Sequence, residues 1–203
     1  MKHFLVLLIA SLVTCSTHAQ FRPDRRPDVG FGLKAGVSVS NMNLNKGYPA
    51  PAENIEPSWK TGFVLGFVMD VPVYGNLRLQ PEYLYLQTNG ENTANGAAYS
   101  FSYLSLPVLF KYPLLGRVSL MAGPQFDLLI KADERLDGNN SVITHDTEER
   151  SIAAVAGMDF SLNSLLSLNA RYLHGFNHIG LGQRSNVTEF KFETIQVSAL
   201  LKF

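Results

Sequence analysis

The sequence predicts an all-β protein, an eight-stranded antiparallel up-and-down transmembrane β-barrel. Three observations predict it. Apolar and polar residues alternate with a period of two in eight segments, the charged residues of these segments all lie on one face, and the connections between the segments alternate between long and short. Such alternation is typical of strands whose two faces meet different surroundings.

The composition excludes several classes of protein. The 203 residues are enough for one domain, and 46% of them are hydrophobic and 17% charged. The Lys+Arg and Asp+Glu counts are both 17, so no basic excess predicts a nucleic-acid partner. The single cysteine, Cys15, excludes an intrachain disulfide and a cysteine-based zinc site. No phosphate-binding loop or dinucleotide-binding motif is present, so we expect no cofactor.

The first 19 residues are typical of a secretory signal peptide. A positive start at Lys2 precedes an apolar run over residues 4–13, and small residues lead to a cleavage site after Ala19. One alternative is a transmembrane anchor, but the run is far shorter than the ~20 apolar residues of a spanning helix. A second alternative is lipidation at Cys15, although Thr14 stands where a smaller residue is usual.

Four alternating segments lie in the N-terminal half of the chain. In each, one face is apolar, as with Phe31, Leu33 and Val37, and the opposite face carries the charged residues, as with Lys34. This contrast predicts four strands, over residues 31–40, 62–71, 77–86 and 104–112.

Four further segments follow in the C-terminal half. The longest sets Phe126 and Leu128 on one face against Gln125 and Asp127 on the other. The last ends the chain with the aromatic residue Phe203 on its apolar face. The pattern predicts strands over residues 117–130, 152–162, 166–173 and 194–203.

The charges separate completely between the two kinds of face. The eight apolar faces hold 42 residues and no charge, where a charged fraction of 17% would place about seven. The opposite faces hold ten charged residues, which are Lys34, Asp70, Arg78, Glu82, Lys111, Arg117, Asp127, Asp159, Arg171 and Lys202.

Alternation alone fits a soluble, lipocalin-like barrel with an apolar interior as well as a membrane barrel with an apolar exterior. A charged side chain that faces lipid costs about 2–4 kcal/mol, so charges in a membrane barrel avoid the outside. Eight strands enclose a narrow interior, which the bulky apolar faces would overfill. Small residues accompany the charges, as a crowded lumen requires, at Gly32, Gly36, Gly62, Gly66, Gly123 and Gly157. We therefore expect the apolar faces to meet lipid.

The connection lengths give an independent test. Short joins are expected at residues 72–76, 113–116 and 163–164, and long joins at residues 41–59, 88–102, 131–151 and 174–193. Outer-membrane barrels have short periplasmic turns and long external loops. The same arrangement here places both termini in the periplasm. With the signal peptide, it divides the chain into a signal peptide (1–19), a periplasmic arm (20–28) and a barrel domain (29–203).

Aromatic residues and prolines refine this expectation. Aromatic girdles are expected from Tyr74, Tyr112 and Phe203 at the short-turn end and from Tyr83, Tyr85 and Tyr103 at the long-loop end. Proline cannot donate a ladder hydrogen bond. We therefore expect bulges or weakened pairing at Pro81, Pro107 and Pro124.

Several short stretches match one protein family. Residues 32–37 (GLKAGV), 79–83 (LQPEY), 103–107 (YLSLP) and 121–124 (MAGP), with Phe203 at the C-terminus, resemble the Bacteroidetes-type outer-membrane β-barrel family of porin-family or PorT-like proteins. The resemblance covers residues 29–203. It implies an eight-stranded barrel in the outer membrane without an assigned reaction, and one branch of the family is linked with type IX secretion.

The luminal charges are the main candidate site. We expect an interlocked structural network of Lys34, Asp70, Arg78, Glu82, Lys111, Arg117, Asp127, Asp159 and Arg171, because buried charges must be paired. Arg78, Glu82 and Arg171 are expected at its centre. The alternative for the same residues is an ion path or a buried catalytic pair.

Other candidate chemistry is weaker. His174 and His178 have a spacing that could hold zinc on a helix, but they lie where a strand leads into a loop. His145 and Asp146 invite a search for a catalytic triad with Ser141 or Ser151, whose geometry a sequence cannot supply. We expect no metal site and no enzyme.

The predicted function is a structural, surface-interaction or assembly role for a barrel with a side-chain-filled lumen. One alternative is a narrow porin-like channel for small solutes, and another is a PorT-like component associated with type IX secretion. The expected partners are outer-membrane lipids and lipopolysaccharide, and the barrel-assembly machinery during biogenesis.

Overall fold

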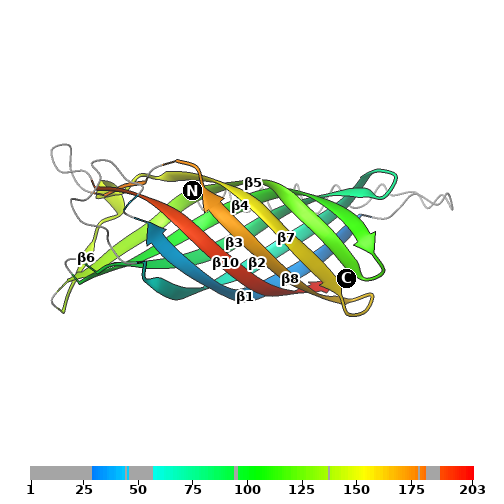
Figure 1. Cartoon of the computed structure of the whole chain (residues 1–203), viewed down its shortest axis with the longest axis horizontal. Helices are drawn as coiled ribbons and strands as arrows, with labels where there is room; N and C mark the ends of the chain where they lie inside the picture. The colour runs from blue at the N-terminus through cyan, green and yellow to red at the C-terminus, as the bar shows by residue number, and fades with distance from the viewer. Residues whose placement is uncertain are drawn as a thin grey trace, which may run out of the picture.

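The structure is a computed structural model that describes residues 29–43, 45, 57–93, 96–136, 138–177, 179–181 and 188–203. The expected signal peptide, Cys15 and the periplasmic arm lie outside the described residues. Figure 1 shows long tilted strands wound into a cylinder. Its wall consists of β1 (Gly30–Asn43), β2 (Trp59–Tyr74), β3 (Leu77–Asn92), β4 (Ala97–Leu115), β5 (Val118–Leu136), β7 (Arg150–Ser161), β8 (Leu166–Gly175) and β10 (Thr188–Lys202).

The wall closes between the first and last strands. Each strand pairs antiparallel with its neighbour in the chain, and β1 pairs with both β2 and β10. Because closure leaves no unpaired edge, the backbone polar groups are satisfied within the sheet. All eight predicted strands are present, and the prediction of a closed eight-stranded antiparallel barrel is confirmed.

The two ends of the cylinder differ. At one end, the short-turn end, only two to four residues join β2 to β3, β4 to β5 and β7 to β8. Gly75 and Gly116 have φ angles of 55° and 53° there, which a residue with a Cβ adopts only with strain. Both β1 and β10 have their terminal ends on this side, since Gly32 pairs with Lys202.

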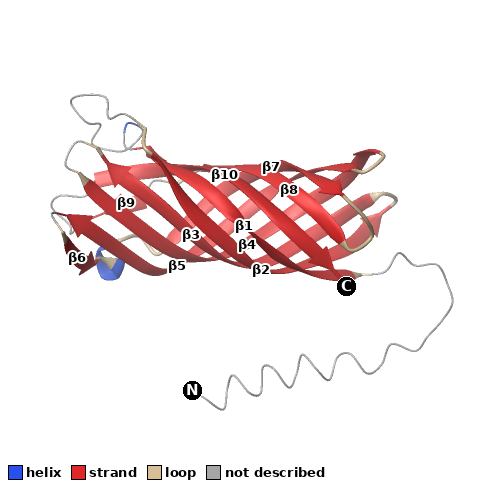
Figure 2. Ribbon diagram, turned by 90° about the horizontal axis from the view of Figure 1, so that it is seen from below, coloured by secondary structure: helices blue, strands red, loops and turns tan. Residues whose placement is uncertain are grey.

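At the opposite, long-loop end the strands are longer than the sequence predicts. The expected loop at 88–102 is wrong, because β3 continues to Asn92 and β4 begins at Ala97. Two short strands and one helical turn are also present at this end, as Figure 2 shows. They are β6 (Asn139–Val142), η3 (Thr144–Asp146) and β9 (Ile179–Leu181). Within the described residues no helix has the length and hydropathy needed to cross a membrane.

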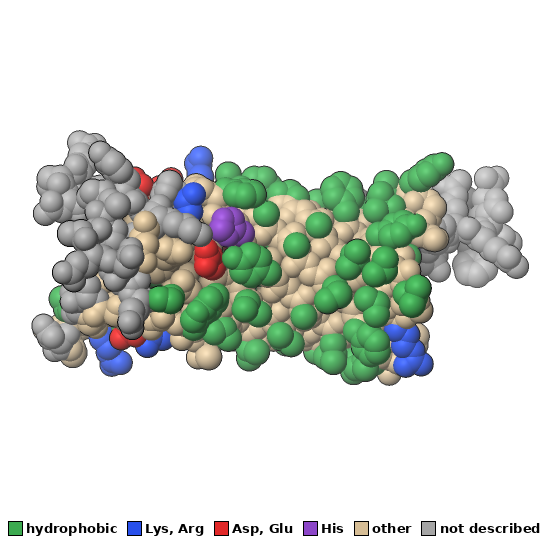
Figure 3. Space-filling model, in the orientation of Figure 1, with side chains coloured by type: hydrophobic (Ala, Val, Ile, Leu, Met, Phe, Trp, Pro, Cys, Tyr) green, Lys and Arg blue, Asp and Glu red, His purple; other side chains and the backbone are tan. Residues whose placement is uncertain are grey.

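The apolar faces point outward, as expected. Phe67 is 61% exposed and Val197 is 49% exposed, whereas Lys34 on the opposite face is 1% exposed. Figure 3 shows hydrophobic side chains spread over the central and short-turn parts of the cylinder and most of the visible charges near the long-loop end. The six expected small residues lie on the inner side of their strands.

One detail of the prediction is confirmed and another is wrong. The ladder is interrupted on one side at each of Pro81, Pro107 and Pro124, as expected for weakened pairing, although no register shift occurs at these residues. The shifts lie elsewhere, between Pro72 and Tyr74, Ser102 and Tyr103, and Pro113 and Leu115. Tyr103 belongs to no outer girdle, because its side chain points inward and is 2% exposed. The other five expected girdle residues are exposed.

The long-loop end forms a distinct part of the barrel, here called the rim. On β4, Tyr99 and Phe101 point inward and are buried, whereas Ser100 and Ser102 lie on the outer side. The rim therefore has an apolar interior and a polar exterior. The remaining cylinder, here called the membrane half, has the opposite arrangement.

Candidate functional site

The centre of the membrane half holds a buried charge cluster around Glu82 of β3. Lys34 of β1 donates from Nζ to both carboxylate oxygens of Glu82 at 3.2 Å. Arg171 of β8 donates from its two terminal nitrogens at 2.9 and 2.8 Å, which is a bidentate contact. Gln80 donates to the same carboxylate at 2.6 Å. The cluster thus joins β3 and β8, which lie on opposite sides of the wall, with β1 midway between them.

Neighbouring residues fix the orientation of Arg171. Its Nε donates to Asn169 Oδ1 at 2.8 Å, and Asn169 donates in turn to the sulfur of Met121 at 3.4 Å. Gly157 pairs with Arg171 on the adjacent strand. A Cβ at Gly157 would lie 2.7 Å from the Cβ of Arg171, so glycine leaves the room that the guanidinium needs. We name this set, Lys34, Gln80, Glu82, Asn169 and Arg171, the central cluster.

A second buried ion pair joins β4 to β7. Lys111 Nζ donates to Asp159 Oδ2 at 2.6 Å, and both side chains are almost fully buried. Two opposite charges at hydrogen-bond distance compensate each other's loss of hydration. The lumen is therefore bridged by side chains at two places along the membrane half.

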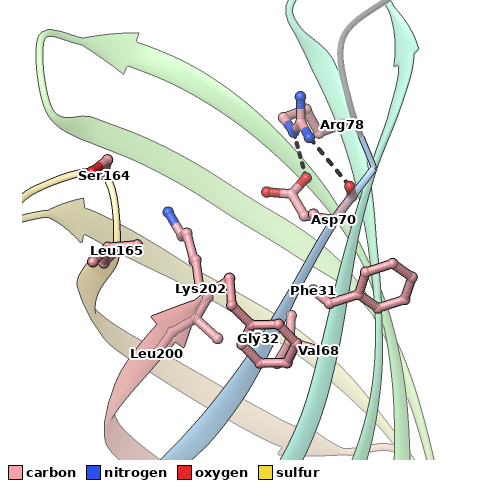
Figure 4. A pocket seen from close by; sticks show the side chains of 11 residues that line it. Phe31, Gly32, Val68, Asp70, Arg78, Ser164, Leu165, Leu200 and Lys202 are labelled. Atoms are coloured by element: carbon pink, nitrogen blue, oxygen red, sulfur yellow. Dashed lines mark hydrogen bonds and ion pairs between the residues drawn. The ribbon is translucent and has the colours of Figure 1, made fainter. Parts of the chain in front are cut away.

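The short-turn end opens into a mouth of about 250 Å³. Arg78 donates from Nε to Asp70 Oδ1 there, and also to the backbone oxygen of Asp70 at 3.2 Å. Figure 4 shows this pair on one side of the mouth, with the Lys202 side chain extending into the space between Asp70 and Ser164. Val68 and Leu200, whose side chains point inward, add apolar walls.

Two sequence-predicted residues lie elsewhere than expected. Arg78 is not at the centre of the network, because it begins β3 beside the turn and pairs with Asp70. Lys34 occupies the central position instead. Arg117 is not in the lumen: it is exposed in the β4–β5 turn and donates to the backbone oxygen of Leu162 at 3.3 Å.

Asp127 lies apart from these ion pairs. It is 6% exposed, and the Gln125 amide donates to its two oxygens at 3.0 and 3.2 Å. The structure therefore brings together Lys34, Glu82 and Arg171, pairs Lys111 with Asp159 and Asp70 with Arg78, and leaves Asp127 with neutral neighbours.

The rim contains an aromatic layer that sequence reasoning missed. Phe101 and Phe190 are fully buried, with ring centroids 5.7 Å apart, and Phe192 packs edge-on against both at 5.5 and 5.0 Å. Tyr99 and Tyr103 stack on either side of Phe101. These five residues form the aromatic layer. The sequence does contain a pattern that indicates this layer, because Tyr99, Phe101 and Tyr103 alternate with small or polar residues.

The rim carries a groove of about 640 Å³, lined by residues from both the inner and the outer sides of its strands. Its charged side chains are Lys60, Lys131, Asp133, Glu134 and Arg135. Lys131 pairs with Asp133 at 2.7 Å, Arg135 donates to Asn140 at 3.1 Å, and Tyr99 donates its hydroxyl to Glu134 at 2.8 Å. The groove thus presents both signs of charge and many hydrogen-bonding groups.

One exposed ion pair lies beside this groove. Lys60 contacts Glu91, and Ser58 donates to the same carboxylate at 3.0 Å. The hydrogen bond from Lys60, followed by that from Ser58, holds the pKa of Glu91 below its usual range.

The described residues of the weaker candidates lie in different surroundings. His145 is exposed on η3, whereas Ser151 is buried on the inner face of β7, and the Asp146 side chain lies outside the described residues. Ser141 is exposed on β6. His174 contacts Tyr172 and Phe176, and His178 lies outside the described residues. The part of the chain that the structure describes contains no group of three His, Cys, Asp or Glu residues placed to hold a metal.

Comparison with known proteins connects this geometry to one family. A family model described as the outer membrane protein beta-barrel domain matches residues 18–180. The fold is similar to the crystal structure of Neisserial surface protein A, with 12% identity, coverage of 87% of this chain and 99% of that chain, and a TM-score of 0.55. No curated protein matches the sequence significantly.

A second similar fold is that of Ail, the attachment invasion locus protein of Yersinia pestis. Its crystal structure has 16% identity, covers 87% of this chain and 99% of that chain, and gives a TM-score of 0.52. A further crystal structure shows Ail in complex with the heparin analogue sucrose octasulfate, at 15% identity, the same coverage and a TM-score of 0.50. At these identities the similarity establishes the fold.

Proposed function

The chain belongs to the outer membrane protein beta-barrel domain family, and from this premise we propose that it is a non-conducting outer-membrane barrel that acts through its rim, without catalysis. The family and the fold support location in the outer membrane. The role that we propose is structural support or surface interaction.

The observation that carries this proposal is the double closure of the lumen. The central cluster joins β1, β3 and β8 across the barrel axis. The aromatic layer then fills the rim, with Phe101 and Phe190 fully buried at its centre. An eight-stranded interior is narrow enough for side chains to fill it. A solute would have to break buried ion pairs and also displace packed rings.

The orientation that we propose follows the general rule for such barrels. Their periplasmic turns are short and their external loops are long. The short-turn end, with both termini, would then face the periplasm, and the rim would face the cell exterior. The rim's polar outer surface would lie above the lipid, where the groove is open to surface saccharides.

Planar-bilayer recording tests the absence of conduction. The wild-type protein is expected to give no steady single-channel steps. Steady steps that change in Glu82→Ala would overturn the closed lumen and support the narrow channel for small solutes. Arg117→Ala is the matched control, because Arg117 is exposed in a turn and outside the central cluster.

Binding at the rim is a separate test. Lipopolysaccharide and sucrose octasulfate are suitable probes, the latter because Ail was crystallised with it. In lipid nanodiscs we expect Arg135→Glu and Lys131→Glu to weaken binding, whereas Arg117→Glu at the opposite end leaves it unchanged. Equal binding by all variants would overturn the role of the groove.

The narrower family assignment and the protein partners stay predictions. A Bacteroidetes-type, PorT-like component would copurify with type IX secretion proteins from outer membranes, and a barrel substrate would be captured by the barrel-assembly machinery during biogenesis. Copurification with the native protein tests both.

A further inference from the structure

Asp127 is a buried carboxyl group that forms no ion pair with any basic residue of the described part of the chain. The other three carboxylates of the lumen all contact a Lys or Arg side chain, which are the pairs of Asp70, Glu82 and Asp159 described above. The donors at Asp127 are neutral: the Gln125 amide contacts both carboxylate oxygens, and the Ser105 hydroxyl lies beside the same group. A buried charge is strongly unfavourable unless it is paired or coordinates a metal ion.

The groups around Asp127 are rich in oxygen. Ser105 of β4 and Ser151 of β7 pair directly with Asp127 on its two neighbouring strands, and all three side chains point inward. Tyr103 is the next inward residue of β4. Its hydroxyl is buried and has no hydrogen-bond partner. A buried hydroxyl without a protein partner is free to contact a bound ligand.

These groups surround a small cavity of about 20 Å³. Tyr103, Gln125, Asp127 and Ser151 line it, with Thr194 from β10. A cavity needs about 10–15 Å³ to hold one water molecule, so there is room for one small ligand. Its apolar lining is Leu86, Ala153, Leu173 and Phe192.

We propose that this cavity binds one monovalent cation of about the size of sodium. The Asp127 carboxylate supplies the charge, and the hydroxyls of Tyr103 and Ser151 supply neutral oxygen ligands. Hard cations prefer such carboxylate and oxygen ligands. A single carboxylate compensates a single positive charge, whereas calcium sites in proteins usually place several carboxylates around the ion.

The experiment uses the full mature protein refolded in detergent micelles. The thermal unfolding midpoint is measured from 1 to 100 mM NaCl, with choline chloride holding the ionic strength constant. A ligand that binds only the folded state raises the midpoint, here by about 3–5 °C for each tenfold rise in sodium above the dissociation constant. An unchanged midpoint in every mixture would overturn the proposal and indicate a protonated Asp127.

Variants locate the effect. Asp127→Asn is expected to abolish the sodium dependence, and a dependence that survives there would also overturn the proposal. Asp159→Asn is the matched control: it neutralises a carboxylate already paired with Lys111, so its midpoint falls and its sodium dependence persists. If Asp127→Asn does not fold, Tyr103→Phe is expected to shift the half-maximal sodium concentration upward, and an unchanged value would count against the site.

Discussion

The membrane half and the rim are built from the same strands with opposite polarity. In the membrane half Phe67 faces outward and Glu82 inward, whereas in the rim Ser100 lies outward and Phe101 inward. Strand geometry is unchanged between them, because side chains alternate in both. What changes is the surrounding medium, from lipid to water. Alternation therefore identifies the strand, and the chemistry of the outer face identifies the solvent.

The switch in polarity coincides with a bulge. The pairing of β4 with β5 shifts between Ser102 and Tyr103, so that Ile130 and Lys131 both lie on the outer side. A bulge inserts one residue and reverses which positions face inward beyond it. Ala132 thereby points inward beneath Phe101, its partner on β4. The rim thus begins at this bulge on β5.

The largest expected effect compares a carboxylate of each half. Glu82→Gln leaves Lys34 and Arg171 as buried cations without a counterion, which should lower the free energy of unfolding by about 3–5 kcal/mol. Urea unfolding in micelles measures it. Glu91→Gln in the rim removes an exposed partner and should cost well under that amount. Equal losses in both variants would contradict the distinction between the two halves.

The second effect tests the outer surfaces. Leu65→Arg places a charge on the lipid-facing side and should cost about 2–4 kcal/mol, so less protein should reach the heat-modifiable folded form on gels. Ser100→Arg makes the same addition to the outer side of the rim, where water solvates the guanidinium. Assembly of Leu65→Arg at the level of Ser100→Arg would show that Leu65 does not face lipid.

The third effect concerns the packing of the aromatic layer. Phe101→Leu keeps an apolar side chain but removes the ring contacts with Phe190 and Phe192, with an expected loss of about 1–1.5 kcal/mol. Phe110→Leu on the exposed outer face of β4 is the control, with a smaller loss. Hydrogen exchange of the β4 amides measures both. A loss confined to Phe110→Leu would mean that the rings in the rim are loosely packed.

Most of the fold could be predicted from the sequence, because lipid enforces the alternation. Every outward position of the membrane half is apolar, so the eight strands and the side that faces lipid followed directly. The strands of the rim were not predicted, because polar outer residues such as Ser100 and Ser102 are typical of a loop when strands are recognised only by an apolar outer face. The parity change at Ile130 also interrupts the pattern on β5.

The sequence predicts most of the residues that belong to the luminal network, but it predicts only partly which of them pair with one another. Eight of the nine charged residues proposed for the lumen lie on inward positions of their strands. Arg117 is the exception, because the predicted strand began one residue too early, in the turn. Which charges meet depends on the tilt of the strands around the barrel, which brings Lys34 of β1 and Arg171 of β8 to the same carboxylate on β3. Sequence alternation contains no information about contacts across the lumen.

The smallest expected effect sharpens the comparison through pH. The pKa of Glu91 is held below its usual range chiefly by the hydrogen bond from Lys60, so its contribution to folding is present above the unfolded pKa of about 4.3 and is lost as the pH falls through the lower, folded value. Trp59, the only tryptophan of the chain, adjoins Lys60 and lies on the rim. Its fluorescence should therefore change on acidification below about pH 4 in the wild type, and Glu91→Gln should remove that step. A fluorescence change that persists in Glu91→Gln would assign it to another carboxylate of the rim. Lys60→Met removes the main hydrogen-bond donor to Glu91, so the fluorescence change should then occur at a higher pH, nearer the ordinary pKa of glutamate.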